Sequence, residues 1–353
     1  MPTQTTIKND RILKALRCQA TDRAPVWMMR QAGRYLPEYQ AIRSQFSFLD
    51  LCKNPVKAAE VSIQPYEIFG VDAIIMFSDI LVPLEPMGSA VSFATGSPKF
   101  AEPIRTVKQV EDLRVLDKDE LAKSCSFVYD TITEIKSKVN DELPVLGFAG
   151  APWTLASYMI EGGGSKDFAQ IKAFSYQHPQ AMHMLLQKLS DTIADYLILK
   201  LDRGVDAVQL FDTWGSVLTQ RDYQEFAMPY QQKIISKIRS VYPDASITLY
   251  VNGVANILDY MVQTGANCLS VDWRVNLAEV RSFVDGKNIA IQGNLDPCKL
   301  LGTKQSVIEE TKRMLELAGN EPGYIANLGH GILPMVPVEN ARAFIETVKN
   351  LAS

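Results

Sequence analysis

The chain has 353 residues, of which 47% are hydrophobic and 22% charged, and its formal net charge is −4 at pH 7. This is an ordinary globular composition, and the length fits two domains or one large α/β barrel. The negative balance argues against a nucleic-acid partner, because domains that bind DNA or RNA are usually basic. No apolar run approaches the length of a membrane span, and residues 1–10 lack the apolar core of a secretory signal. We therefore expect a cytoplasmic protein with neither nucleic acid nor membrane as a partner.

The cysteines predict neither a disulfide framework nor a metal site. There are five, they are widely spaced, and none forms a C-x-x-C pair: Cys18, Cys52, Cys125, Cys268 and Cys298. This pattern indicates free thiols in a reducing compartment. We expect no bound metal.

The chain opens with helical spacing over about 8–18, which Asn9 or Asp10 could cap, and an apolar run, Val26–Met29, follows Pro25. This run has the length of a buried strand, and Arg30, Gly33 and Arg34 come directly after it. Two guanidinium groups at one strand end can hold carboxylates or phosphates through paired N–H donors. The alternative is that the two arginines form ordinary surface ion pairs, and the local pattern does not decide between them.

Residues 35–53 are polar and irregular, 54–69 read as an amphipathic helix, and a second apolar run over 72–77 ends at Ser78-Asp79. Prolines and glycines then punctuate the chain over about 80–115. This predicts an inserted hairpin or flap after the second strand.

Helices and strands alternate over the rest of the chain. The expected helices lie at about 119–138, 166–174, 178–203, 221–241, 254–264, 276–284, 303–318 and 337–351, and the expected strands at 144–149, 207–211, 246–251, 268–271, 289–292 and 323–328. Eight strands separated by helices predict a single (β/α)8 TIM-type barrel, with residues 1–353 as one domain. An open doubly wound sheet is the alternative. A dinucleotide-binding sheet would need a glycine-rich phosphate loop after its first strand, where this chain has Arg-Gln-Ala-Gly-Arg.

Active sites of such barrels lie at the carboxyl ends of the strands. The polar and aromatic residues just past the expected strands are Arg30, Arg34, Asp79, Trp153, Tyr158, Asp212, Thr213, Asn252, Asp272, Trp273, Gln292, Asn294 and His330. Asp212, Asp272 and Asn294 have a second interpretation as helix caps, and we leave Asp212 outside the site. Glycines flank His330, which indicates a ligand-facing loop, whereas His178 and His183 fall in a helix and are expected to be structural.

Several segments together resemble one family. They are 25–39, Phe77-Ser-Asp-Ile80, 147–165, Phe211-Asp-Thr-Trp-Gly215, Gln292-Gly-Asn294 and Asn327-Leu-Gly-His-Gly-Ile332. In content and order they resemble the uroporphyrinogen decarboxylase family of haem biosynthesis, from about residue 8 to 350. The resemblance implies a carboxy-lyase that converts the four acetate side chains of uroporphyrinogen III to methyls, giving coproporphyrinogen III. It also implies a homodimer that uses no cofactor, because the protonated pyrrole is itself the electron sink.

The resemblance also assigns the site residues. Asp79, Arg34 and Tyr158 would be catalytic, and the substrate would contact Arg30, Gln31, Ala32, Gly33, Arg34, Asp79, Tyr158, Thr213 and His330. Asp79 would accept the pyrrole N–H groups and stabilise the developing cation. Arg30 and Arg34 would bind carboxylates, although Arg34 is a poor acid. Tyr158 or His330 would take part in proton relay.

Three other functions make different demands on the sequence. A zinc- and cobalamin-linked methyltransferase, which shares this barrel, needs a late His/Cys zinc site. A non-catalytic tetrapyrrole carrier would keep the arginines but would have no need for Asp79. A Schiff-base aldolase needs a lysine at a strand end, and none of the eight expected ends has one.

Overall fold

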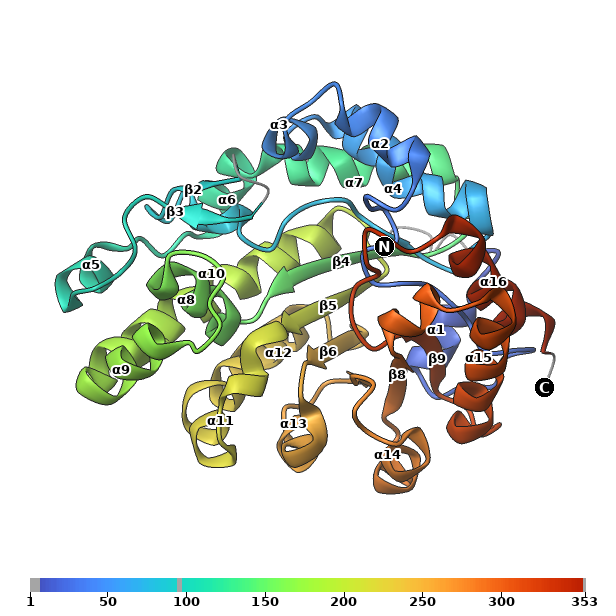
Figure 1. Ribbon diagram of the computed structural model, residues 1–353. Coiled ribbons are helices and arrows are strands. Elements are labelled where there is room, and N and C mark those ends of the chain that lie inside the picture. Colours follow the sequence, from blue (N-terminus) through green and yellow to red (C-terminus); the bar gives the residue numbers. More distant parts are fainter. Residues whose placement is uncertain (1–6, 94–96, 352–353) are drawn as a thin grey trace.

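The computed structural model describes residues 7–93 and 97–351, and its centre is a curled sheet of seven parallel strands (Figure 1). In spatial order they are β1 (Ile74–Ile75), β4 (Val145–Gly150), β5 (Ala207–Asp212), β6 (Ile247–Val251), β7 (Cys268–Ser270), β8 (Ala290–Leu295) and β9 (Tyr324–Leu328). Apart from Phe211, every residue of these strands is buried, as expected for parallel strands covered on both faces. Each strand pairs with the next in chain order, so all carboxyl ends meet at one rim.

The predicted strand at 26–29 closes the sheet between β9 and β1. Val26 forms a parallel bridge with Ala326 of β9, and the Ala326 N–H donates to Pro25 O at 2.9 Å. On the other side, the Asp72 N–H donates to Val26 O at 2.8 Å. The TIM-type barrel is therefore confirmed. Its eighth member is a bridge and not a ladder, because the N–H groups of Met28 and Met29 donate to the side chains of Gln31 and Asn327 and not to a neighbouring strand.

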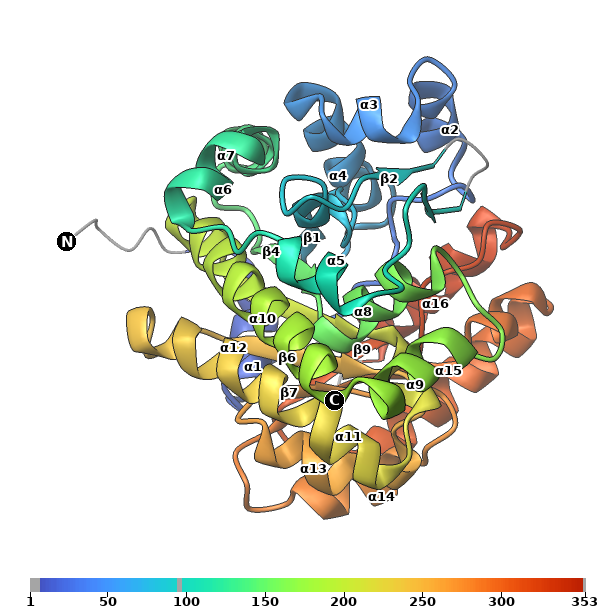
Figure 2. The same cartoon turned by 90° about the vertical axis from the view of Figure 1, so that its left-hand side faces the viewer.

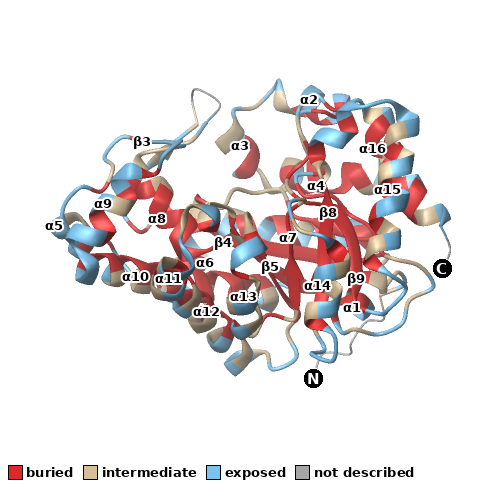
Figure 3. Cartoon of the chain, turned by 60° about the horizontal axis from the view of Figure 1, so that its bottom comes forward, coloured by how far each residue is buried: buried red, intermediate tan, exposed pale blue. Residues whose placement is uncertain are grey.

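Helices surround the sheet on its outside (Figure 2), and the strands form the buried centre of the molecule (Figure 3). The larger outer helices are α4 (Pro55–Phe69), α7 (Ser126–Val139), α10 (Pro179–Asp202), α12 (Met228–Val241), α14 (Leu277–Val284), α15 (Lys304–Ala318) and α16 (Val338–Asn350). Neighbours in this layer pack in pairs, as α4 does with α7 and α10 with α12. In the described part of the chain, no helix combines the length and apolar character needed to cross a membrane.

Shorter helices complete the layer. They are α1 (Arg11–Leu16), α9 (Ala169–Gln177), α11 (Gln220–Phe226) and α13 (Leu258–Gln263), with the 3-10 turns η2 (Thr213–Val217), η3 (Val254–Asn256) and η4 (Pro297–Leu301). Asp10 occupies the N-cap position of α1 but makes no side-chain capping bond. The expected helix at 119–138 is divided into α6 (Lys118–Ser124) and α7, and that at 221–241 into α11 and α12.

Two stretches depart from the sequence prediction. Residues 35–53, expected to be irregular, contain α2 (Pro37–Arg43) and α3 (Phe48–Cys52), which bury Ile42 and Leu51 among other residues. Each helix is too short to show a periodic pattern, and tertiary burial stabilises it. The glycine-rich stretch 147–165 contains α8 (Pro152–Glu161), which starts with proline at its first turn and ends at Gly162 with φ 82°.

The interval between β1 and β4 holds an antiparallel pair, β2 (Val91–Ser92) and β3 (Lys99–Phe100), with η1 (Val82–Leu84) before it and α5 (Val107–Asp112) after it. Residues 94–96, between the two strands, lie outside the described part. A hairpin in this interval agrees with the expectation, and its action as a flap stays a prediction.

Candidate active site

The first site segment follows the closing strand and is fixed by a buried glutamine. Gln31 is fully buried, donates through Nε2 to Ala73 O at 3.0 Å and accepts the Met28 N–H through Oε1 at 3.1 Å. Gly33 is required by close approach, since a Cβ there would lie 2.8 Å from Arg30 O. Ala32 and Gly33 are half-buried, and Arg30 and Arg34 are exposed. The Gln31 side chain is thus used for hydrogen bonds within the protein. These bonds fix the backbone that carries Arg30 and Arg34 at the rim.

Arg30 and Arg34 have no carboxylate partner in residues 7–93 and 97–351. Arg23, at the opposite end of the closing strand, behaves differently: it pairs with the buried Asp72 at 2.7 Å. The surface ion pairs considered for Arg30 and Arg34 are therefore not formed in the described chain. Both guanidinium groups are available to an anionic ligand.

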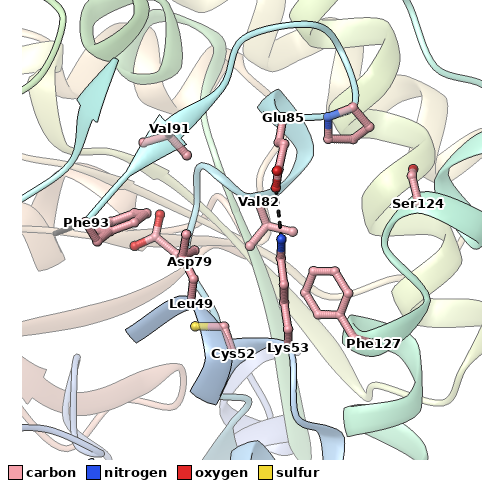
Figure 4. A pocket seen from close by; sticks show the side chains of 11 residues that line it. Leu49, Cys52, Lys53, Asp79, Val82, Glu85, Val91, Phe93, Ser124 and Phe127 are labelled. Atoms are coloured by element: carbon pink, nitrogen blue, oxygen red, sulfur yellow. Dashed lines mark hydrogen bonds and ion pairs between the residues drawn. The ribbon is translucent and has the colours of Figure 1, made fainter. Parts of the chain in front are cut away.

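Asp79 lies four residues past the end of β1, with one oxygen engaged and one not. Its Oδ1 accepts the Leu81 N–H at 2.8 Å, and Oδ2 has no hydrogen-bond partner among the described residues. Burial raises the pKa of Asp79 to about 6, against smaller lowering effects of the Leu81 N–H and of Arg30. Asp79 lines a small pocket together with residues of α3, η1, β2, α6 and α7 (Figure 4), and none of the other predicted site residues lines it. The carboxylate is therefore a partly satisfied acceptor beside a pocket.

Tyr158 reaches the same region from α8 and not from a strand end. Its ring lies edge-on to Trp214, with centroids 5.8 Å apart. The pKa of Tyr158 is raised, and burial is the largest cause. Contact with Trp214 and the charge of Arg30 lower this pKa, and the charge of Asp79 raises it further. Tyr158, Arg30 and Asp79 thus share one electrostatic neighbourhood.

Thr213 begins η2 and is half-buried, and the turn that carries it is held by Asp212. Thr154 Oγ1 donates to Asp212 Oδ1 at 2.6 Å, and Gln231 Nε2 donates to Oδ2 at 2.7 Å. Thr154 Oγ1 also accepts the Trp214 N–H at 3.0 Å. Asp212 makes no capping bond, so the helix-cap alternative is wrong for it. It joins β5, α8 and α12 beneath the turn.

His330 lies in the loop after β9, between two close neighbours. A Cβ on Gly331 would lie 2.4 Å from Arg30 Cδ, and one on Gly329 would lie 2.6 Å from Trp273 N. Burial, with a smaller effect of Arg30, lowers the pKa of His330 to about 4. The imidazole is therefore neutral at pH 7. It can donate or accept hydrogen bonds but carries no charge at that pH.

The other histidines of the described chain lie away from this site, as expected. His183 Nδ1 is 2.6 Å from the Tyr230 hydroxyl, and its ring stacks on Phe226. His178 lies at the junction of α9 and α10.

Two remaining strand-end residues order the rim. The buried carboxylate of Asp272 accepts the N–H groups of Gly253, Val254 and Arg274, at 3.1 Å for Val254 and 3.0 Å for Arg274. Asn294 Nδ2 donates to Asp272 O at 2.9 Å. Neither caps the following helix: Asn276 caps α14, and Asp296 caps η4.

Gln292 was predicted at a strand end but lies inside the barrel, because β8 continues to Leu295. Its Oε1 accepts the Trp27 indole N–H at 2.9 Å, and its Nε2 donates to Ser270 Oγ at 2.9 Å. Trp153 is also buried, and its indole donates to Trp214 O at 3.1 Å. Both residues support the rim from within.

Comparison with known proteins places the chain in a family. The family described as uroporphyrinogen decarboxylase matches residues 7–351. A curated uroporphyrinogen decarboxylase of Gloeobacter violaceus is 45% identical over 342 residues, covering 97% of each chain. That of Geobacter metallireducens is 45% identical over 344 residues, covering 98% of this chain and 99% of its own.

The chain belongs to the uroporphyrinogen decarboxylase family. A solved methyltransferase from Methanosarcina mazei superposes on this family member with a TM-score of 0.82 over 99% of this chain and all of the other, at 21% identity. At that identity the likeness concerns the fold alone. In residues 7–93 and 97–351, His, Cys, Asp and Glu side chains form no group of three suited to holding a metal ion.

Two residues beside the predicted site residues were not predicted with them. Trp214 contacts Tyr158, and Arg274 lies at the rim past β7, where its charge lowers the pKa of His330 after the larger effects of burial and of Arg30. A signal was available for Arg274, since it directly follows Trp273, the last residue considered there. A signal was also available for Trp214, since it lies in the segment Phe211-Asp-Thr-Trp-Gly215 that carries part of the family resemblance.

Proposed function

We propose that this protein is a uroporphyrinogen decarboxylase, a carboxy-lyase that converts the four acetate side chains of uroporphyrinogen III to methyls and yields coproporphyrinogen III. Membership of the family supports the reaction class. The structural observation that carries the proposal is Asp79: a strand-end carboxylate with one unengaged oxygen, which shares its electrostatic neighbourhood with the unpaired Arg30 and with Tyr158.

Each step of this reaction consumes one proton. A pyrrole ring is protonated at its α-carbon, and the bond between the acetate methylene and its carboxylate breaks. The electron pair enters the ring, and carbon dioxide leaves. A proton then adds to the methylene to make the methyl group, and the ring proton is released. The protein must therefore stabilise a cationic ring and deliver a proton to carbon.

Asp79 suits the first task, because a fixed carboxylate can accept the pyrrole N–H groups and stabilise positive charge as it develops in the ring. Its raised pKa of about 6 still leaves it mostly ionised at pH 7. We assign substrate carboxylates to Arg30 and Arg34, whose paired donors fit them.

For the remaining predicted residues we assign polar contacts. Tyr158 and Thr213 lie on α8 and η2, and His330 on the loop after β9. Tyr158 keeps its proton at pH 7, because burial raises its pKa, and can donate or relay it. Ala32 and Gly33, with the backbone of Gln31, complete the wall beside the arginines.

We further propose that the chain works as one domain, as a cytoplasmic homodimer, and without metal or organic cofactor. The barrel closure and the family support the single domain. The homodimer rests on the family resemblance, and sedimentation of the purified protein at micromolar concentration would test it. A monomer at that concentration would contradict it.

The decisive experiment is anaerobic incubation with uroporphyrinogen III, followed by oxidation and chromatography of the porphyrins. We expect the eight-carboxylate substrate to be converted to the four-carboxylate product with unchanged yield in the presence of a chelator. Unaltered uroporphyrinogen would refute the proposed function. Loss of turnover in chelator with recovery on adding zinc would refute the cofactor-independent mechanism.

A further inference from the structure

Arg274 is an arginine at the barrel rim, four residues past the end of β7, that the predicted site does not include. Its side chain is 47% exposed. The guanidinium lies over the Trp273 ring, 4.8 Å from the centroid, and Nη2 donates to Asn252 Oδ1 at 3.2 Å. An aromatic face and a neutral amide oxygen orient this cation without cancelling its charge.

The carboxylate closest to Arg274 in the described chain, that of Asp272, already accepts backbone N–H groups. Asp272 Oδ1 lies 3.6 Å from Arg274 Nε, too far for a good hydrogen bond. Both oxygens of Asp272 accept backbone N–H groups, from Gly253 and Val254 on one and from Arg274 itself on the other. The buried carboxylate therefore holds two loops together and leaves the guanidinium with unused donors.

Arg274 lies across the His330 loop from Arg30. Arg30 packs against Gly331 and Trp273 packs against Gly329, so His330 is between them. Both arginines contribute to lowering the pKa of His330, after the larger effect of burial, and both oppose the effect of burial on the pKa of Tyr250, whose ring lies 6.2 Å from His330. Two cations thus flank one polar wall of the site.

Lys299 provides a useful contrast. It follows β8 as Arg274 follows β7, with its side chain 49% exposed, but its amine is paired with Glu310 at 3.2 Å. A rim cation with no ligand to bind is expected to be neutralised in this way. Arg274 is oriented and left without a full ion pair.

We propose that Arg274 binds a side-chain carboxylate of the tetrapyrrole substrate, on the opposite side of His330 from Arg30. The inference rests on the proposed function and deepens it. A substrate with eight carboxylates needs more cationic donors than Arg30 and Arg34 supply, and a guanidinium oriented by Trp273 and Asn252 loses little freedom on binding. Four of the eight carboxylates are not lost in the reaction, and a contact to one of them contributes equally to substrate and transition state.

The test is steady-state kinetics with uroporphyrinogen on Arg274→Gln and Arg274→Lys. Loss of one charge-assisted contact should raise KM about tenfold, with kcat within about twofold, because uniform binding appears in KM. Arg274→Lys should recover part of the affinity, since a point charge replaces the paired donors. The control is Arg313→Gln, which replaces an exposed residue of α15. It makes the same change in net charge and should leave KM unchanged.

Asn252→Asp gives an independent readout with Arg274 intact. The new carboxylate would pair with the guanidinium and compete with the substrate, so KM should rise while thermal stability is kept. An unchanged KM in both Arg274→Gln and Asn252→Asp, with normal wild-type turnover, would overturn this inference but not the proposed function. An equal rise of KM in Arg313→Gln would also overturn it, because net charge would then be the cause. Absence of wild-type turnover would instead refute the proposed function.

Discussion

The ends of β1 and β5 each carry a carboxylate whose pKa burial raises to about 6, Asp79 and Asp212, yet the two are built differently. Asp212 is fully buried and accepts one side-chain donor on each oxygen, from Thr154 and Gln231. Asp79 accepts one local N–H and keeps its second oxygen without a partner in the described chain, beside a pocket. A raised pKa therefore does not separate the carboxylate that we propose to be catalytic from the structural one. The two differ in unused acceptor capacity.

The largest expected effect is on turnover of Asp79→Asn. This change keeps the shape and removes the charge that we assign to the pyrrole cation, so kcat should fall by about 100- to 1,000-fold. The affinity for coproporphyrinogen, which has the N–H groups but no cation, should weaken less. Both should be measured on one folded preparation. Near-normal turnover would reduce Asp79 to a turn residue and remove the basis of the comparison.

Asp212→Ala should instead reduce stability. It leaves the hydroxyl of Thr154 and the amide of Gln231 without their charged acceptor in the core, at a cost on the order of 3 kcal/mol in free energy of unfolding. Denaturant unfolding measures it. Asp79→Asn should be neutral or stabilising in the same assay, because at pH 7 it removes a half-buried charge that has only one hydrogen-bond donor in the described chain. Equal destabilisation by both changes would show that the two sites do not differ as described.

The pH dependence of kcat/KM should identify the carboxylate that controls activity. Ionised Asp79 is the active form and its pKa is about 6, so kcat/KM should be level near pH 7 and about tenfold lower at pH 5. The residual activity of Asp79→Asn should lack this acid limb. If the limb persists there and disappears when Asp212 is replaced, the roles of the two carboxylates are reversed.

The smallest expected effect belongs to His330→Gln. The pKa of His330 is lowered to about 4, so the imidazole is neutral across pH 5 to 8 and acts through hydrogen bonds, which glutamine retains in part. Turnover should fall by less than about tenfold, and the shape of the pH profile should not change. Loss of an alkaline limb in the variant would mean that a cationic His330 donates the proton.

Much of the fold could be predicted because the parallel strands are mostly apolar runs, such as 207–211 and 323–328, followed by glycines and polar residues. Failures came where tertiary contacts decide. The short helices α2 and α3 show no periodicity, and β8 extends past Gln292 because its polar residues bond inside the barrel. The start of α8 was readable in principle, since Pro152 is typical of a first helical turn.

The site could be predicted as a set of strand-end residues but not as a set of available groups. In the sequence, Asp79 and Asp212 both follow an apolar run of strand length. Only the structure shows that Thr154 and Gln231 donate hydrogen bonds to both oxygens of Asp212. For the same reason it left open whether Arg30 and Arg34 pair with surface acids. Partners distant in sequence decide which polar groups remain free, and a linear pattern does not contain them.

The barrel is closed by the same short piece of chain that leads into Arg30. Four main-chain bonds tie it to its neighbours: Trp27 N–H to Ala326 O at 3.3 Å, Ala326 N–H to Pro25 O, Asp72 N–H to Val26 O and Ile332 N–H to Met29 O. If Arg30 binds the substrate as proposed, binding should also stabilise the closure of the barrel. In amide hydrogen exchange the Trp27 amide should open more often than those in the ladder of β5 and β6, which has five paired positions. A tetracarboxylate that binds Arg30 and Arg34 should slow that opening. The closing segment would then be the weakest part of the barrel in the free protein, and ligand binding would stabilise it.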